Sequence, residues 1–214
     1  MSQKVPVSNN DKRRFPVRKL TMTAMLGAVA TVLMKFPSFK LPFMPYFISM
    51  DFSELPALIA SFALGPISGV IVCLIKNLFS LLSTNTLGVG ELSNFLLGAV
   101  FVFTAGMFYK HMGGRRGALI GSLLGAVMMA VFSVFSNYYI VYPFFAKLFQ
   151  FENGVADLVA LYQAINPNVK NLWDALIWFN MPFTFIKGLI SVVITFLIYK
   201  KISPLLKGRK KDSQ

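Results

Sequence analysis

The sequence predicts an all-α, polytopic membrane protein with six transmembrane helices and both termini in the cytoplasm. Hydrophobic residues make up 56% of the 214 residues and charged residues only 14%, against roughly 25% charged residues in a soluble domain. The mean hydropathy is +0.64, and several apolar stretches reach the length of about 18 residues or more that crosses the hydrocarbon core. The basic residues gather in alternate connections, which sets the orientation.

The first three spans are separated by proline and glycine. The first span is expected over about Val17 to Phe36, and because it is a full span rather than a short apolar region, no cleavable signal peptide is expected. The second, over about Asp51 to Leu64, is short and is interrupted by Pro56. The third follows the break at Gly65-Pro66 and ends near Leu82.

The last three spans are longer. They are expected over about Leu92 to Tyr109, Ala118 to Phe145 and Leu172 to Ile198, with Gly113-Gly114 dividing the first two. Residues 146–171 are expected to form an external loop with an amphipathic helical stretch over 155–165.

Charge asymmetry places both ends of the chain in the cytoplasm. Most of the 21 basic residues lie before the first span, between the fourth and fifth, or after the sixth, and the positive-inside rule assigns these segments to the cytoplasm. The expected organisation is a basic tail over residues 1–16, a transmembrane substrate-binding domain over 17–200 and a second basic tail over 201–214. The opposite connections hold few basic residues, namely Lys35, Lys40, Lys147 and Lys170.

Motifs for catalysis are absent from the sequence. An ATP-driven pump needs a phosphate-binding loop of the form GxxxxGK[ST], which does not occur. The single histidine, His111, lies in a predicted cytoplasmic loop, and the single Cys73 excludes an internal disulfide and a cysteine-based metal site. We therefore expect neither an enzyme nor a metal or catalytic cofactor.

Polar residues inside the sixth span are the first candidates for binding. Asn180, Thr184 and Lys187 are spaced i, i+4, i+7, which places them on one helix face, and Lys187 is near the middle of the span, where a charge is most unfavourable. Pro182 removes a backbone donor and frees the carbonyl near Trp178. Asn180 and Thr184 also fit a role in helix–helix hydrogen bonding, whereas Lys187 needs an acceptor from another helix or from a ligand.

Other spans supply companions for this face. Asn137 lies in the outer half of the fifth span, and Glu91 and Asn94 open the fourth. Asp51 starts the second span with Glu54 three residues later, a spacing that also fits a capping box, and Glu91 also fits a helix N-terminal cap. Backed by aromatic residues, this set suits a flat heteroaromatic molecule with carbonyl and ring-nitrogen edges better than an inorganic ion.

Small residues at every fourth position form two helix faces. Gly117, Gly121 and Gly125 favour close packing inside the protein. Ala24 and Ala28, on the cytoplasmic side of the first span, fit contact either within the chain or with another protein.

The stretches DFSELPALIASFALGP, GVGELSNFLLG and MPFTFIKG, in this order on a six-span chain, resemble the RibU group, the riboflavin-specific substrate-binding (S) components of energy-coupling factor (ECF) transporters. The resemblance covers nearly the whole chain. It implies a vitamin site near the outer surface of a bacterial cell membrane, covered by the loop over residues 37–50, which contains Tyr46. It also implies docking through Ala24 and Ala28 onto a membrane coupling subunit that works with two cytoplasmic ATPases.

The resemblance also assigns roles to single residues. Lys187 matches the lysine that contacts the flavin ring, which provides the acceptor that this lysine needs, and Asn137 matches the asparagine of the fifth span. Thr184 stands where the family commonly has an asparagine. The implied function is binding and uptake of riboflavin, with FMN and FAD as possible further ligands.

Three alternatives remain open at the level of sequence. The chain fits an S component for another vitamin, such as thiamine or biotin. It also fits a facilitator that needs no motor, or a membrane protein with a purely structural role.

Overall fold

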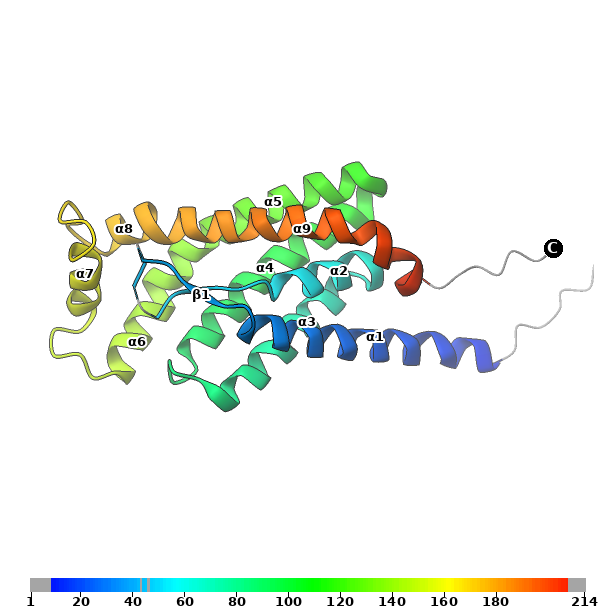
Figure 1. Cartoon of the computed structure of the whole chain (residues 1–214), viewed down its shortest axis with the longest axis horizontal. Helices are drawn as coiled ribbons and strands as arrows, with labels where there is room; N and C mark the ends of the chain where they lie inside the picture. The colour runs from blue at the N-terminus through cyan, green and yellow to red at the C-terminus, as the bar shows by residue number, and fades with distance from the viewer. Residues whose placement is uncertain (1–8, 43, 46, 208–214) are drawn as a thin grey trace, which may run out of the picture.

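The computed structural model describes residues 9–42, 44, 45 and 47–207 and consists of helices with one small hairpin (Figure 1). In chain order the elements are α1 (Asn9–Lys35), β1 (Phe39–Lys40), β2 (Ser49–Met50), α2 (Glu54–Leu64), α3 (Pro66–Ser80), the 3₁₀ turn η1 (Leu81–Ser83), α4 (Val89–Met112), α5 (Gly114–Ser136), the π-helical turn η2 (Asn137–Val141), α6 (Tyr142–Leu148), α7 (Val155–Gln163), α8 (Leu172–Ala175), the π-helical turn η3 (Leu176–Asn180) and α9 (Met181–Lys207).

Five stretches of helix are long and apolar enough to cross a membrane. They are Val17–Lys35, Pro66–Ser83, Val89–Met112, Gly114–Leu148 and Leu172–Ile198. The helical membrane protein expected from the sequence is therefore confirmed, and five of the six predicted spans have a helix of sufficient length.

The predicted second span is the exception. Its helix, α2, has only 11 residues, or about 16 Å at 1.5 Å per residue, and the chain enters it through the non-helical residues 51–53. Pro56 does not interrupt α2, because it lies in the first turn, where a backbone N–H has no partner within the helix. Polar Asp51 and Ser53 belong to the lead-in rather than to the helix.

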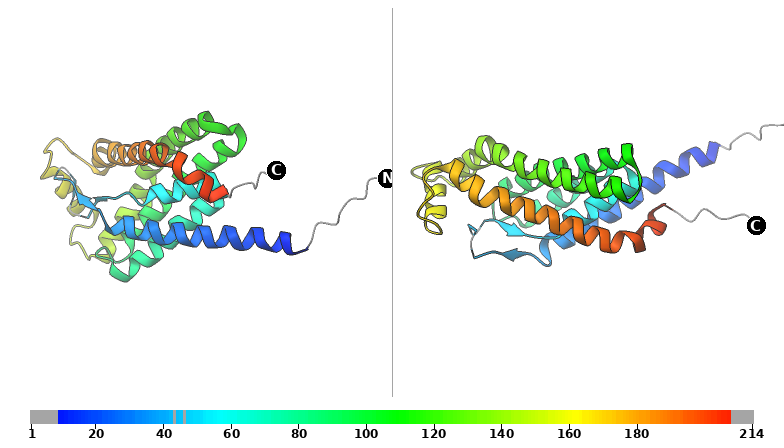
Figure 2. Two further views of the ribbon diagram at one scale, coloured as in Figure 1. Left: turned by 45° about the vertical axis from the view of Figure 1, so that its right-hand side comes forward. Right: turned by 90° about the horizontal axis from the view of Figure 1, so that it is seen from above.

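With the short α2 included, the helices α1, α2, α3, α4, α5 and α9 run back and forth along the molecule in this order (Figures 1 and 2). The start of α1 and the end of α9 lie at one end of the molecule, and α7 lies at the opposite end (Figure 1). Helix α2 runs through the middle and packs against α1, α3, α4 and α9. It is buried from Glu54 to Phe62, which explains why its sequence is apolar on every side.

The glycines of α5 allow α4 to approach closely. A Cβ atom added at Gly121 would lie 2.7 Å from the carbonyl oxygen of Ala105, and one at Gly125 would lie 2.7 Å from that of Phe101. The prediction that these small residues serve internal packing is confirmed for both positions.

The connection between α1 and α2 contains the only strands among the described residues. β1 and β2 pair antiparallel, with Phe39 opposite Met50 and Lys40 opposite Ser49. An all-α prediction missed this hairpin because two-residue strands leave no periodic pattern in the sequence. Ser49 and Met50 lead directly into Asp51, so the hairpin is joined to the polar lead-in of α2.

Helix α7 is attached to the opposite end of the bundle by a core of its own. Leu158 and Tyr162 are fully buried, against Tyr142, Phe145 and Leu176 among others. The amphipathic stretch predicted over 155–165 is thus a helix whose apolar side covers α6 and η3.

Candidate functional site

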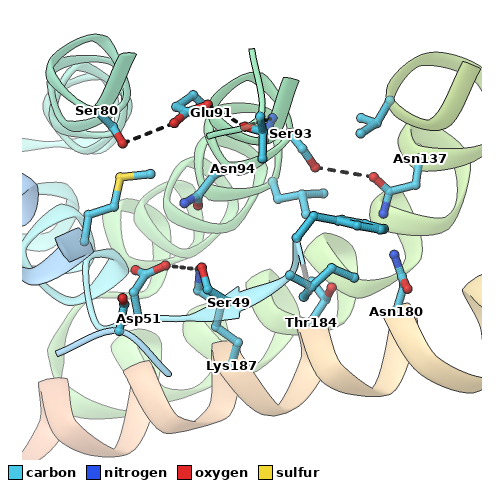
Figure 3. Close-up of a pocket in the computed structure, with 18 of the residues that line it drawn as sticks. Ser49, Asp51, Ser80, Glu91, Ser93, Asn94, Asn137, Asn180, Thr184 and Lys187 are labelled. Atoms are coloured by element: carbon cyan, nitrogen blue, oxygen red, sulfur yellow. Dashed lines mark hydrogen bonds and ion pairs between the residues drawn. The ribbon is translucent and has the colours of Figure 1, made fainter. Parts of the chain in front are cut away.

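A cavity of about 390 Å³ lies between the hairpin, α4, η2 and α9, with the start of α2 at one side. Its volume falls in the range of roughly 300–1,000 Å³ typical of small-molecule sites. All of the predicted substrate-binding residues that the structure describes line it (Figure 3): Asp51, Glu91, Asn94, Asn137, Asn180, Thr184 and Lys187. Tyr46 lies outside the described residues.

The polar face predicted for the sixth span is present. Asn180, Thr184 and Lys187 all line the cavity from the same side (Figure 3), and Phe183 lines it as well. Asn180 and Thr184 are buried, at 4% and 6% exposure, so none of the three looks towards lipid.

Two π-helical turns place the asparagines. η2 begins at Asn137 and η3 ends at Asn180, and each turn is followed two residues later by a proline, Pro143 or Pro182. Because proline has no N–H and its ring crowds the carbonyl four residues earlier, the helix widens locally by one residue, a feature that often marks functional sites. The sequence indicated the break at Pro182 but not the change in helix type.

Asn180 is held in a closed ring of hydrogen bonds with two tyrosines. The Tyr162 hydroxyl donates to Asn180 Oδ1 over 2.6 Å, and Asn180 Nδ2 donates to the Tyr142 hydroxyl over 2.9 Å. The two hydroxyls are also bonded to each other, and since Tyr162 has given its proton to Asn180, Tyr142 must be the donor. One N–H of the Asn180 amide remains available to a ligand.

Tyr142 and Tyr162 were not predicted to belong to the site. Tyr162 lies in α7, at one end of the molecule. Burial is the main cause, and the neighbouring Tyr142 the next, of a pKa of the Tyr162 hydroxyl well above the ordinary value, so this hydroxyl keeps the proton that it donates. Sequence spacing cannot relate α7 to α9, because the two helices meet only through the fold.

Lys187 finds its acceptor within the chain. Its Nζ donates to Asp51 Oδ2 over 2.8 Å, with the two side chains 11% and 3% exposed. Of the two sources of an acceptor expected for Lys187, another part of the chain or a ligand, the chain itself provides one in Asp51. Asp51 also accepts from the backbone N–H of Ser53 over 2.9 Å, so it stabilises the turn before α2.

The alternative of a capping box at the start of α2 is wrong. The residue before α2 is Ser53, which makes no capping hydrogen bond with its side chain. Glu54 instead forms an ion pair of 2.7 Å with Lys76 of α3, and both side chains are almost fully buried. Gly98 of α4 makes room for this carboxylate, because a Cβ atom there would lie 2.7 Å from Glu54 Oε2.

Glu91 belongs to the first turn of α4, where a carboxylate is favoured by the helix dipole. Its hydrogen bonds go to side chains of the preceding connection rather than to helix N–H groups. Oε2 accepts from the hydroxyls of Thr84 and Thr86 over 2.9 and 3.0 Å, and Oε1 accepts from Ser80 over 3.4 Å. Glu91 thus fixes the connection between α3 and α4 at the edge of the cavity.

The side-chain amides of Asn94 and Asn137 have hydrogen-bonding groups left for a ligand. Asn137 Oδ1 accepts from Ser93 over 3.3 Å, while within the described part of the chain no partner is recorded for its Nδ2 or for the side chain of Asn94. With Lys187 and the free N–H of Asn180, the cavity offers several donors opposite the aromatic walls formed by Phe47 and Phe183. This combination suits a flat polar aromatic ligand.

Ala24 and Ala28 lie away from the cavity, on an exposed face of α1. The side of α1 that packs inward carries Thr23, Gly27 and Ala30 instead. The two alanines are therefore free to contact another protein.

Comparisons with known proteins extend over most of the chain. A family model for the substrate-specific component of ECF transporters matches residues 18–199. The riboflavin transporter RibU of Staphylococcus aureus (strain TCH60) is 32% identical over 190 residues, which cover 89% of this chain and 93% of that protein. The riboflavin transporter FmnP of Bacillus subtilis (strain 168) is 28% identical over 197 residues, which cover 91% of this chain and 96% of that protein.

A solved structure of the S component of a bacterial ECF transporter has the same fold. Its TM-score to this chain is 0.69 at 30% sequence identity, and the match covers 90% of this chain and 99% of that structure.

Proposed function

Because the chain belongs to the family of substrate-specific components of ECF transporters, we propose that it binds riboflavin at the outer face of a bacterial cell membrane and takes it up with ATPase subunits on other chains. The relatives described above are named as riboflavin transporters, not enzymes. A separate motor accounts for the lack of a phosphate-binding loop in this sequence.

We assign the binding site to this cavity because the predicted polar residues converge on it. Residues from the α2 lead-in, α4, η2, η3 and α9 meet there, although they are up to 136 positions apart in the chain. The flavin ring is flat, with carbonyl and ring-nitrogen edges that need donors, and Lys187 and the amides of Asn94, Asn137 and Asn180 supply them. Thr184, Glu91 and Asp51 complete the proposed set.

The proposed topology has six passes with both termini in the cytoplasm. The second pass consists of α2 and its extended lead-in. The surrounding helices shield the lead-in from lipid, because backbone that is not helical is tolerated within a bilayer only where protein buries it. The end of the molecule that holds the start of α1 and the end of α9 then also carries basic residues from the end of α4 and the start of α5, namely Lys110, Arg115 and Arg116, in agreement with the positive-inside rule. Residues 17–200 form the transmembrane domain, flanked by the basic tails 1–16 and 201–214.

Ala24 and Ala28 are the proposed docking face for a membrane coupling subunit, which would transmit the work of two cytoplasmic ATPases. Support comes from their exposure on α1 and from the small size of their side chains, which lets two helices approach closely.

Equilibrium dialysis of the purified protein against riboflavin tests the proposed ligand. We expect one saturable site with a dissociation constant below about 1 μM, and visible absorbance beforehand shows whether flavin has co-purified. FMN, FAD, thiamine and biotin serve as competitors. Tryptophan fluorescence is a weaker readout, because Trp178 is 73% exposed and does not line the cavity.

Two results would contradict the proposal. Colourless protein that binds no riboflavin, or that prefers thiamine or biotin, would refute the flavin assignment. Riboflavin uptake by the isolated chain in liposomes without ATPase subunits would favour a facilitator.

A further inference from the structure

A continuous chain of buried polar contacts leads from Lys187 on the cavity wall to a second ion pair, Lys76–Glu54, whose lysine lies behind that wall. Lys187 donates to Asp51 Oδ2, and Asp51 Oδ1 accepts from both the backbone N–H and the hydroxyl of Ser53. Lys76 Nζ then donates to Ser53 Oγ over 2.6 Å and to Glu54 Oε1 over 2.7 Å. Neither Ser53 nor Lys76 is among the described residues that line the cavity.

The direction of each hydrogen bond in this chain is fixed by chemistry. A lysine ammonium only donates, so Ser53 Oγ must accept from Lys76, and the single hydroxyl proton of Ser53 is left for Asp51. With Oδ1 occupied by two donors from Ser53, the carboxylate turns its other oxygen, Oδ2, towards Lys187. The orientation of Asp51 is therefore set from behind the cavity.

Net stability does not account for the burial of the second pair. Lys76 and Glu54 are 0% and 1% exposed, and a buried ion pair contributes little net stability compared with well-packed apolar residues of similar volume. Glu54 lines the cavity but Lys76 does not, and among the described residues the other hydrogen bond of Lys76 goes to Ser53.

We infer that Ser53 is a positioning residue for Lys187, with its hydroxyl oriented by the Lys76–Glu54 ion pair. This inference rests on the proposed function, because it concerns how Lys187 is presented to the flavin. Ser53 acts only through Asp51, and the bonds it makes hold the ammonium of Lys187 at one place on the cavity wall.

A double-mutant cycle with riboflavin as the probe tests the inference. Ser53→Ala removes the hydroxyl without changing any charge, and we expect it to weaken riboflavin binding by roughly tenfold, the size of one hydrogen bond to a charged group. In a Lys187→Met background the same substitution is expected to change binding by less than about twofold, because the residue being positioned is gone. Ser53→Thr, which keeps the hydroxyl, is expected to restore most of the affinity.

Ser61→Ala is the matched control. Ser61 is as buried as Ser53, but it lies within α2, and its hydroxyl donates to the backbone carbonyl of Val102 in α4. It is expected to leave riboflavin affinity unchanged.

Two results would overturn the inference while leaving the proposed function intact. One is wild-type affinity in Ser53→Ala, and the other is an equal loss in both backgrounds, which a purely structural role would give. Failure of the wild-type protein to bind riboflavin would instead refute the proposed function.

Discussion

At the scale of single residues, we expect riboflavin binding to depend most on the ion pair between Lys187 and Asp51. The two charges are paired with each other, so a flavin that accepts a hydrogen bond from Lys187 must share this lysine with Asp51. A lysine ammonium has three protons, and the contact with Asp51 uses one of them. Lys187 can thus bind a ligand without leaving its partner.

Lys187→Met should weaken riboflavin binding by about 1–3 kcal/mol, the range for losing a partner to a buried polar group. The same variant leaves Asp51 buried without a counter-charge, which should lower the free energy of unfolding by about 3 kcal/mol. Dialysis and thermal unfolding measure the two effects separately.

The double variant Asp51→Asn/Lys187→Met separates stability from binding. Removing both charges should restore most of the thermal stability, while riboflavin affinity stays low. Recovery of affinity together with stability would show that Lys187 does not contact the ligand.

At the scale of elements, α7 is connected to the binding face of α9 through the hydroxyl of Tyr162. This hydroxyl donates to Asn180 and closes the ring with Tyr142. The ring determines which side of the Asn180 amide faces each tyrosine, and therefore which group it offers to the cavity. An external helix thus sets the orientation of a side chain in the proposed site.

Tyr162→Phe should leave the Asn180 carbonyl without its donor and lower the free energy of unfolding by about 1–2 kcal/mol. Riboflavin affinity should fall several-fold, because the amide is then free to turn over. Tyr139→Phe is the matched control, since Tyr139 lies in the neighbouring turn η2 but is 67% exposed. Equal affinities for the two variants would show that the ring has no influence on binding.

Ala24→Trp should leave riboflavin binding by the purified protein unchanged and reduce uptake by cells to the level of cells lacking the protein, because a large side chain prevents close approach of the coupling subunit. Val29→Trp is the control variant. Val29 is also exposed on α1, but because it lies five residues after Ala24, its side chain points in a direction roughly 140° away around the helix. Normal uptake by Ala24→Trp would exclude this face from docking.

At the scale of the whole molecule, the proposed six passes predict where reagents reach the protein. In intact cells, a membrane-impermeant maleimide should label Asn168→Cys, in the α7–α8 connection, but not Arg115→Cys, in the first turn of α5. Both positions are exposed, whereas the native Cys73 is fully buried and gives little background. Labelling at Arg115→Cys alone would reverse the proposed orientation.

The sequence is sufficient to predict the long helices and seven polar residues of the cavity wall. Continuous apolar runs identify spans directly, and the spacing of Asn180, Thr184 and Lys187 places them on one face. The sequence pattern places the start of the second span at Asp51, three residues before α2 begins. Pairings such as Lys76 with Glu54 and Tyr162 with Asn180 join segments distant in the chain, and no local pattern reveals which partners the fold brings together.

The half-length of α2 has a consequence for how the site arises. Eleven residues rise about 16 Å, roughly half of a hydrocarbon core of about 30 Å, and Asp51 and Glu54 at the start of α2 border the cavity. The cavity therefore lies beside the end of α2 at which a full-length helix would have further turns. A vitamin bound there would fill space within the bundle, so the protein with riboflavin bound should be measurably less compressible than the protein without it.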